Sequence, residues 1–513
     1  MGMCYGNPVS DRKRKFAPGS PHIASAKRSK KPGLRIGGLP EDILSSIISK
    51  LPLKEAARTS ILSSQWRRIW LCRANIDLSY HTVFSQSDKV RGWTTRGNIL
   101  NRLKFIKSVG VVLQQHEGVG TENIRISFHL CDRYADHMDK WVKYTIASKA
   151  KGLILELLSM KFGPTIVRYN FPLQMLDTKK NSSLRRLRLH FVSLCPPADF
   201  RGFQNLTRLC LQDVNITNED LQRLLSEGNH LECFRIACCE TLTSLRIPHY
   251  VNRLKFLLVL SCPLLQDITL DCVVPALHYR GPLIPLELAA PSKLTNLWVE
   301  LSSCHSALGF ISSELPTTIP HLEMLTFRCS QFEVCISHDV LIFLGCAHIY
   351  FSWVPFFFCI QRADVVSRLR SFLSLRHLVL DLTITDLPRR TIDILDLGYL
   401  PEAAPFVEKL ELHMVMDCLH KSYCQEDGEL RSLPICPHSH LSLVTITGFI
   451  GEKDQLELAL HILHNAMVLK ALKIYRLRSE ERIADGRRVA LDFLAESDHR
   501  NVVEVDGAFN SPS

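Results

Sequence analysis

The chain has 513 residues, of which 46% are hydrophobic and 22% are charged, and its formal net charge is +11. This length allows several domains, or one small domain followed by an extended repeat array, and the composition is that of a globular protein. Residues 1–38 carry nine Lys and Arg side chains against one Asp, so the other 475 residues hold a net charge of only +3. A body this balanced lacks the basic face of a nucleic-acid-binding domain, and no nucleic acid partner is expected.

Residues 1–33 combine Pro, Gly, Ser and basic residues without hydrophobic periodicity, which predicts a disordered tail. Two basic clusters in this tail, separated by eleven residues, are typical of a bipartite nuclear import signal. The clusters are Arg12, Lys13, Arg14 and Lys15, then Lys27, Arg28, Lys30 and Lys31. The alternative is a solvated basic tail that only aids solubility.

The 18 cysteines stand singly apart from Cys238-Cys239, and the sequence contains no CxxC pair. Several of them fall inside apolar runs, where a free cysteine packs as a small core residue. Scattered, unpaired thiols are typical of a reducing compartment. Together with the basic tail, this predicts a protein of the nucleus and cytoplasm.

Three short helices are predicted from Leu39 onward. Pro40-Glu41-Asp42 suits the first turn of a helix, and the apolar residues that follow form one stripe at three- and four-residue steps. The stripe consists of Ile43, Leu44, Ile47, Ile48 and Leu51, and Pro52 ends the helix. A second helix is predicted over residues 54–60, and Ser63 is predicted to cap a third that carries Trp66 and Trp70. Three short helices bury little surface alone, so part of the stripe is expected to face a partner.

The remaining chain repeats a template with apolar residues at its first, fourth and sixth positions. The repeats start mostly 22–34 residues apart, which is the period of an irregular leucine-rich-repeat array. They begin at Leu184, Leu206, Leu231, Leu294, Leu322, Leu375, Val407, Leu441 and Leu469. Between Leu231 and Leu277 the spacing halves to 11 or 12 residues, which leaves no room for a helix and predicts strands on both faces. Residues 216–225 are predicted to form a helix, with Asn218 as a candidate cap.

Near the end of the chain, a strand is predicted from Leu441 to Thr447, followed by a turn between Gly448 and Gly451. Apolar residues from Leu456 to Met467 then indicate an amphipathic helix.

Residues 340–360 contain no formally charged side chain. Three interpretations remain open for residues 331–370: a buried or irregular solenoid segment, a membrane span, or non-coding sequence translated from a faulty gene model. His348 and Pro355 lie inside the apolar run and soluble repeats flank it, so membrane insertion is not expected.

Several of these motifs resemble those of known plant families. Residues 37–75 resemble a plant F-box, through Leu39-Pro40-Glu41-Asp42-Ile43-Leu44, the run 51–56 and the run from Arg58 to Trp70, although Ser64-Gln65 replaces two residues that are usually basic. The stretch from Pro437 to Ala459 resembles the FBD region of plant F-box/leucine-rich-repeat proteins. The runs 169–172, 206–209 and 215–217 resemble the plant repeat family labelled after a mini zinc finger protein.

The resemblance implies an α/β chain with four parts. These are a disordered basic tail (1–33), a three-helix F-box (34–78), an irregular leucine-rich-repeat solenoid (79–436) and an FBD-like region (437–513). It also implies an adaptor that docks a Skp-type adaptor, and through it a cullin, while the repeats hold an unknown target protein. The residues expected to dock are Leu39, Pro40, Ile43, Leu44, Leu51 and Pro52. The alternative is a nuclear repeat scaffold that binds a protein without ubiquitination.

The sequence carries none of the common motifs of catalysis or cofactor binding. It has no Gly-rich phosphate loop, no HExxH and no Ser-centred elbow between glycines. Cys436, His438 and His440 lack the spacing of a tetrahedral zinc site. No catalytic residue, cofactor or metal is therefore expected, and the chain is predicted not to be an enzyme.

Removal of residues 1–33 is expected to abolish nuclear enrichment while leaving thermal unfolding of the body unchanged. The reason is that the import clusters sit in a segment without core residues. Fluorescence imaging of the tagged full-length and truncated proteins checks this. Continued nuclear concentration of the truncated chain would refute the import signal.

Overall fold

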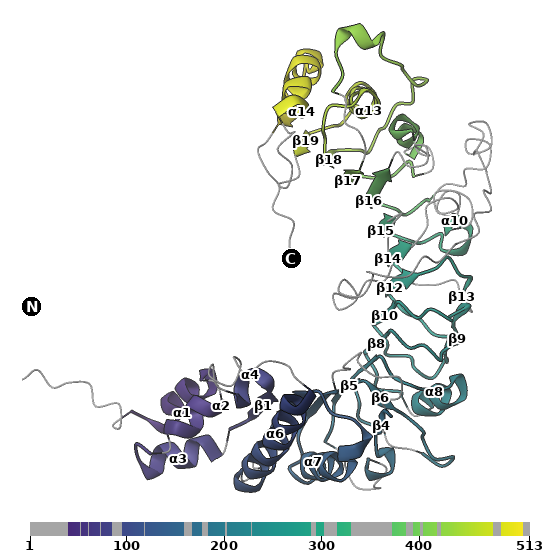
Figure 1. The fold of residues 1–513 in the computed structure, drawn as a ribbon. Coiled ribbons are helices and arrows are strands. Elements are labelled where there is room, and N and C mark those ends of the chain that lie inside the picture. Colours follow the sequence, from purple (N-terminus) through teal and green to yellow (C-terminus); the bar gives the residue numbers. More distant parts are fainter. Residues whose placement is uncertain are drawn as a thin grey trace, which may run out of the picture.

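The computed structural model describes the chain from residue 39 to 505 with gaps (Figure 1). The described ranges are 39–51, 53–59, 61–71, 73–84, 95–116, 118, 120–157, 167–176, 183–200, 203–226, 228–288, 294–301, 315–329, 372–385, 393–400, 404–417, 422–475 and 484–505. The two basic clusters, Pro52 and residues 331–370 lie outside them. Across these ranges, no helix is both long enough and apolar enough to cross a membrane.

The F-box region forms the three predicted helices: α1 (Glu41–Lys50), α2 (Leu53–Thr59) and α3 (Ser64–Leu71). Pro40 precedes α1, and two acids occupy its first turn. The Ser63 hydroxyl accepts a hydrogen bond from the Trp66 N–H at 3.3 Å, as the predicted cap requires. The buried side chains of Leu44, Ile48, Trp66 and Trp70 hold these helices together.

The main sheet begins directly after α3, inside the range predicted for the F-box. Strand β1 (Asn75–Ser79) pairs in parallel with β2 (Asn123–Phe128), which pairs with β3 (Gly152–Leu157). Between them lie α4 (Tyr80–Val83), α6 (Thr95–Gln115), η2 (Asp132–Tyr134) and α7 (Ala135–Ala147). The sequence did not predict these elements, which join the F-box to the repeats without a break in the sheet.

Within the described residues, fifteen strands form one parallel sheet that lines the inner side of a curved solenoid (Figure 1). After β3 come β5 (Arg186–His190), β7 (Arg208–Gln212), β8 (Cys233–Ala237), β10 (Phe256–Leu260), β12 (Ala276–Gly281), β14 (Asn296–Leu301) and β15 (Met324–Cys329). The sheet ends with β16 (His377–Thr385), β17 (Lys409–Asp417), β18 (Leu443–Thr447), β19 (Ala471–Tyr475) and β20 (Val503–Val505). The α/β leucine-rich-repeat architecture is confirmed.

The outer side of the solenoid carries strands where the repeat spacing halves, as predicted. They are β9 (Ser244–Ile247), β11 (Asp267–Leu270) and β13 (Leu286–Leu288), which pair in parallel. Two shorter strands, β4 (Tyr169–Asn170) and β6 (Val192–Ser193), pair with one another in parallel. The 3-10 helix η3 (Leu173–Met175) lies between them in the sequence. The outer helices include α8 (Asn218–Leu225) and the short α10 (Leu315–Thr318).

The predicted cap of α8 is off by one residue. Thr217 is the cap, because its hydroxyl accepts from the Asp220 N–H at 3.1 Å. Asn218 is the first helical residue, and its amide donates to the Thr243 hydroxyl of the next repeat at 2.7 Å. The asparagine therefore links two repeats.

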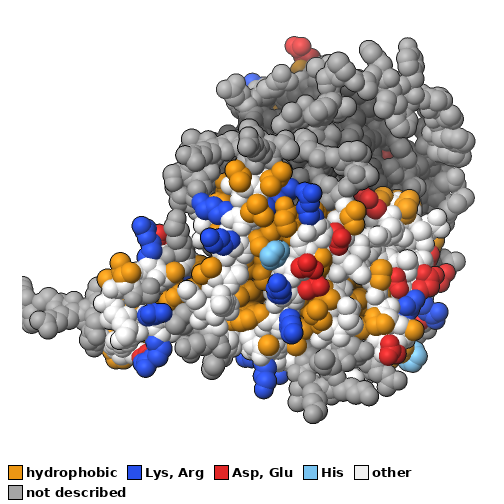
Figure 2. Space-filling model, turned by 60° about the horizontal axis from the view of Figure 1, so that its bottom comes forward, with side chains coloured by type: hydrophobic (Ala, Val, Ile, Leu, Met, Phe, Trp, Pro, Cys, Tyr) orange, Lys and Arg blue, Asp and Glu red, His pale blue; other side chains and the backbone are white. Residues whose placement is uncertain are grey.

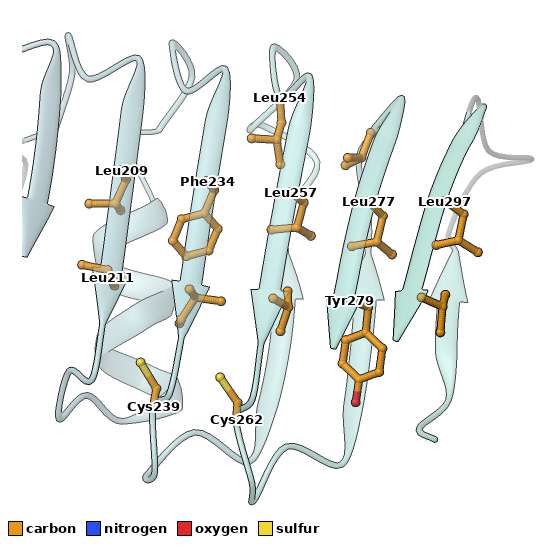
Figure 3. Packing of buried hydrophobic residues seen from close by; sticks show 14 of the residues in the cluster. Leu209, Leu211, Phe234, Cys239, Leu254, Leu257, Cys262, Leu277, Tyr279 and Leu297 are labelled. Carbon is orange, nitrogen blue, oxygen red and sulfur yellow. The ribbon is translucent and has the colours of Figure 1, made fainter. Parts of the chain in front are cut away.

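The core is built from stacked rows of side chains (Figure 3). Leu209, Phe234, Leu257, Leu277 and Leu297 are register partners on successive strands, and all five are buried. The inner strands β5, β7, β8 and β10 are each followed by a residue of positive φ: Phe191, Asp213, Cys238 and Ser261. None is a glycine, although the left-handed region disfavours other residues. Cys239 and Cys262 each follow one of these turns, and the two buried side chains occupy equivalent positions in adjacent repeats (Figure 3).

The C-terminal part extends the same sheet. Gly448 and Gly451 both have positive φ and form the predicted turn before α13 (Lys453–Asn465). Around α13 lie η5 (Ile394–Tyr399), η6 (Gln425–Asp427), α14 (Ala484–Val489) and the π-helical η7 (Ala490–Ala495). The helix is covered more completely than an amphipathic pattern predicts, because Asp454, Gln455, Glu457, His461 and Asn465 are buried too.

Replacing Leu209 by Ala is expected to lower the free energy of unfolding by about 2–5 kcal/mol, the range for truncating a buried leucine. Repeats without separate cores unfold together, so the loss should appear in one cooperative transition. Leu264→Ala, at an exposed position, is the control. Chemical denaturation of both variants measures the difference, and equal stability of the two would contradict the assigned packing.

Candidate functional site

The F-box residues predicted to dock a partner divide into surface and core. Pro40 is exposed and Ile43 is 45% exposed, whereas Leu39 and Leu51 are half-buried against the core. Leu44 has no exposed surface, so its place in a docking face is corrected: it packs inside the module. Pro52 lies outside the described residues.

Other apolar side chains of the F-box are exposed as well. Ile47 lies one turn after Ile43 on α1 and is partly exposed. Ile61 and Leu62, in the turn between α2 and α3, are 87% and 64% exposed. An apolar pair in a helix–helix turn is the signal that could have identified them. The surface of the projecting F-box shows apolar side chains beside Lys and Arg (Figure 2).

The inner face of the solenoid is a second candidate surface. In each inner strand the side chains alternate between the core and this face, and the strict register places the outward ones in rows. One row runs Arg188, Cys210, Arg235, Leu258, His278 and Trp298 over β5, β7, β8, β10, β12 and β14. The parallel stacking therefore brings together residues far apart in sequence.

An apolar and aromatic group, here called the central patch, occupies the middle of this face. It consists of Phe256, Leu258, Leu260, His278 and Trp298. The rings of His278 and Trp298 stack with centroids 3.6 Å apart, and Trp298 is 38% exposed. Strand β10 reads Phe-Leu-Leu-Val-Leu, apolar on both faces. This apolar run was the sequence signal for the central patch. It was not recognised as such because it also fits the repeat template.

His278 is held neutral in the central patch. Burial, with Arg280, Arg328 and Arg235 nearby, lowers its pKa to about 4. Its buried Nε2 atom has no hydrogen-bond partner among the residues that the structure describes.

An arginine cluster lies beside the central patch. Arg186 and Arg208 are direct register partners, while Arg188 and Arg235 flank Cys210 in the neighbouring row. Arg188 pairs with Glu156 at 3.2 Å, and Glu156 also binds Arg125 at 2.9 Å. Arg235 lies over the Phe256 ring at 5.6 Å. Like charges directly opposite one another destabilise a sheet, so the Arg186–Arg208 pair reduces the stability of the solenoid.

On the other side of the central patch, charges neutralise one another. Glu300 lies 3.6 Å from Arg280, and Arg328 pairs with Asp381 at 2.6 Å. One strand further, hydrogen bonds from His377 and His413 hold the pKa of Glu411 far below its ordinary range. The inner face is thus basic on its N-terminal side and balanced on its C-terminal side.

Among the described residues, no three His, Cys, Asp or Glu side chains converge as metal ligands. The His438 and His461 rings are 6.2 Å apart, and burial lowers the pKa of His438 to about 4. Cys436 and the exposed His440 do not join them in a cluster.

Residues 112–500 match the family model described as the At1g61320/AtMIF1 LRR domain, and residues 36–73 match the F-box domain. Similar Arabidopsis thaliana proteins include the putative F-box/LRR-repeat protein At5g02930, 26% identical over 62% of this chain. The putative F-box/LRR-repeat protein At5g54820 is 30% identical over 40% of it. These alignments span 59% and 43% of the two relatives. FBD-associated F-box protein At5g38590 is 24% identical over 89% of this chain and 97% of its own length.

Replacing His278 by Gln is expected to reduce the acid sensitivity of the fold. Between the ordinary histidine pKa and the lowered folded value, only the unfolded state binds a proton at this site, so wild-type stability falls as the pH drops. At about pH 5 the difference should be roughly 1–2 kcal/mol. Unfolding at neutral pH and at pH 5 measures it, with the exposed His137→Gln as control. Identical pH dependence in all three proteins would show that His278 is not buried in neutral form.

Proposed function

The chain belongs to the F-box/leucine-rich-repeat family with an At1g61320/AtMIF1-type repeat domain, and from this premise we propose that it is a substrate-recognition adaptor of a Skp–cullin–F-box ubiquitin ligase. In this role the F-box binds a Skp-type adaptor and the inner face of the solenoid holds a target protein. The chain itself catalyses nothing. It raises the local concentration of the target near the charged conjugating enzyme.

The observation that carries the proposal is the exposed apolar surface of the F-box helices. Ile43, Ile47 and the Ile61-Leu62 pair expose apolar side chains on a module whose core is already complete without them. Exposed apolar groups gathered on one small module are typical of a protein-binding surface. An apolar partner surface would cover them, and the F-box family match supports a Skp-type adaptor as that partner.

The connection between F-box and solenoid also supports an adaptor. Trp70 in α3 and Ile76, the second residue of β1, belong to one continuous core. Helix α2 packs against β1 as well as against α3. A rigid connection keeps the target at a fixed distance from the ligase, which favours transfer by proximity.

We place this activity in the nucleus and cytoplasm, because the basic tail has the composition of an import signal. The runner-up function, a nuclear repeat scaffold without ubiquitination, shares the solenoid but requires no adaptor binding. Capture of a purified Skp-type adaptor therefore separates the two functions.

The double variant Ile43→Ser with Ile47→Ser is expected to weaken capture of a purified Skp-type adaptor at least tenfold. Removing two apolar contacts from a buried interface exceeds the roughly 1.4 kcal/mol that a tenfold loss requires. Calorimetry with the full-length protein measures the affinity. Because both side chains are already exposed, thermal stability should change little.

The matched control is Ile99→Ser with Leu100→Ser, which removes two exposed apolar side chains from α6 outside the F-box. Its affinity should equal that of the wild type. If the α1 variant and this control bind the adaptor equally well, the α1 surface is not the interface. If the wild type binds no adaptor, the scaffold is the better description.

A further inference from the structure

We propose that the inner face over β7–β14 binds an extended segment of a target protein that carries an apolar or aromatic anchor and, beside it, a short run of Asp and Glu. This inference rests on the proposed function for one point only, that the bound molecule is the target protein. The anchor would occupy the central patch, and the acidic run would pair with the arginine cluster.

The central patch fits an apolar anchor because small side chains surround its large ones. In register, Cys233 separates Arg208 from Phe256, and Ala276 follows Phe256. Ala237 likewise precedes Leu260. Large aromatic residues beside small ones leave room for an inserted side chain, and exposed aromatic residues of this kind often dominate binding.

The arginine cluster fits carboxylates because two of its members lack them. In the described part of the chain, neither Arg208 nor Arg235 has a carboxylate partner. Both are exposed, on adjacent strands, at the border of the central patch. An acidic segment would reduce the repulsion between Arg208 and its register partner Arg186, and it would gain charge-assisted hydrogen bonds.

The asymmetry of the inner face orients the segment. From β12 to β16, the row of Arg280, Glu300, Arg328 and Asp381 is neutral in sum and already paired. Acidic residues of the target gain nothing there, so they belong on the side of β7 and β8. The same carboxylates repel a nucleic-acid backbone, which would otherwise follow the arginines along the face.

The distance between anchor and acids follows from the strand spacing. Trp298 lies three strands from Arg235 and four from Arg208 in the sheet order. At about 4.8 Å per strand this is about 14–19 Å, which an extended chain covers in about four to six residues. The inference therefore predicts a spacing as well as a composition.

The test measures the binding of short synthetic peptides to the full-length protein by fluorescence anisotropy. Each peptide of the array carries a Trp or Leu anchor and three Glu at a varied separation. Peptides with a separation of about four to six residues should bind best. Replacing Glu by Gln should weaken their binding at least tenfold. Affinity should fall as salt is raised.

Charge reversal supplies the decisive comparison. The double variant Arg208→Glu with Arg235→Glu should bind the Glu peptides at least tenfold more weakly than the wild type does. It should bind the matching Lys peptides more tightly than the wild type does, which also shows that the variant is folded. The control Arg133→Glu with Arg487→Glu changes two exposed arginines away from the inner face and should bind like the wild type. Trp298→Ala should weaken all anchored peptides regardless of their charge.

Several results would overturn the inference. These are equal binding of Glu and Gln peptides, no binding across the whole array, binding only when Ser phosphates replace the carboxylates, or binding only of a single-stranded oligonucleotide. Adaptor capture by the same protein preparations is measured in parallel. Peptide failure with intact adaptor binding rejects this inference alone, whereas loss of adaptor binding in the wild type rejects the proposed function.

Discussion

The structure depends on in-register stacking of apolar rows that no single repeat can bury. Leu209 and Leu257 are covered only because Phe234 lies between them on the intervening strand, and the same holds along the sheet from Ile76 to Ile474. Because each repeat depends on its neighbours, the array folds as a unit. The register also fixes every outward side chain in a row, so the constraint that makes the core places Arg235, Leu258 and Trp298 on one line.

The apolar template was enough to predict the strands. The pattern formed by Leu184, Leu187 and Leu189 recurs along the chain with a period that only stacked strands satisfy. The halved spacing predicted the outer strands, because a repeat of 11 or 12 residues is too short to hold a helix. The strands β1 and β2 escaped prediction because Asn75–Ser79 and Asn123–Phe128 are separated by the short α4 and the 21-residue α6, which broke the period. The positive-φ turns at Phe191 and Asp213 were hidden because neither residue is a glycine.

The sites were less predictable than the fold, because one stripe of α1 serves two purposes. Periodicity grouped Ile43 with Leu44, but only packing against α3 shows that Leu44 is core while Ile43 is exposed. The inner face was harder still, since the arginine cluster and the central patch exist only once strands are placed side by side. Together the two surfaces lie on one continuous core, which supports an adaptor that holds a target at a fixed position relative to its ligase.

The most direct measurement of this account is the mass of the assembly formed when the purified full-length protein is mixed with a Skp-type adaptor and a cullin. Light scattering coupled to size exclusion reports it without labels. The account predicts a single species with one copy of each chain, and no association of this protein with the cullin when the adaptor is omitted. A protein that elutes alone in the complete mixture, or that binds the cullin directly, would contradict it.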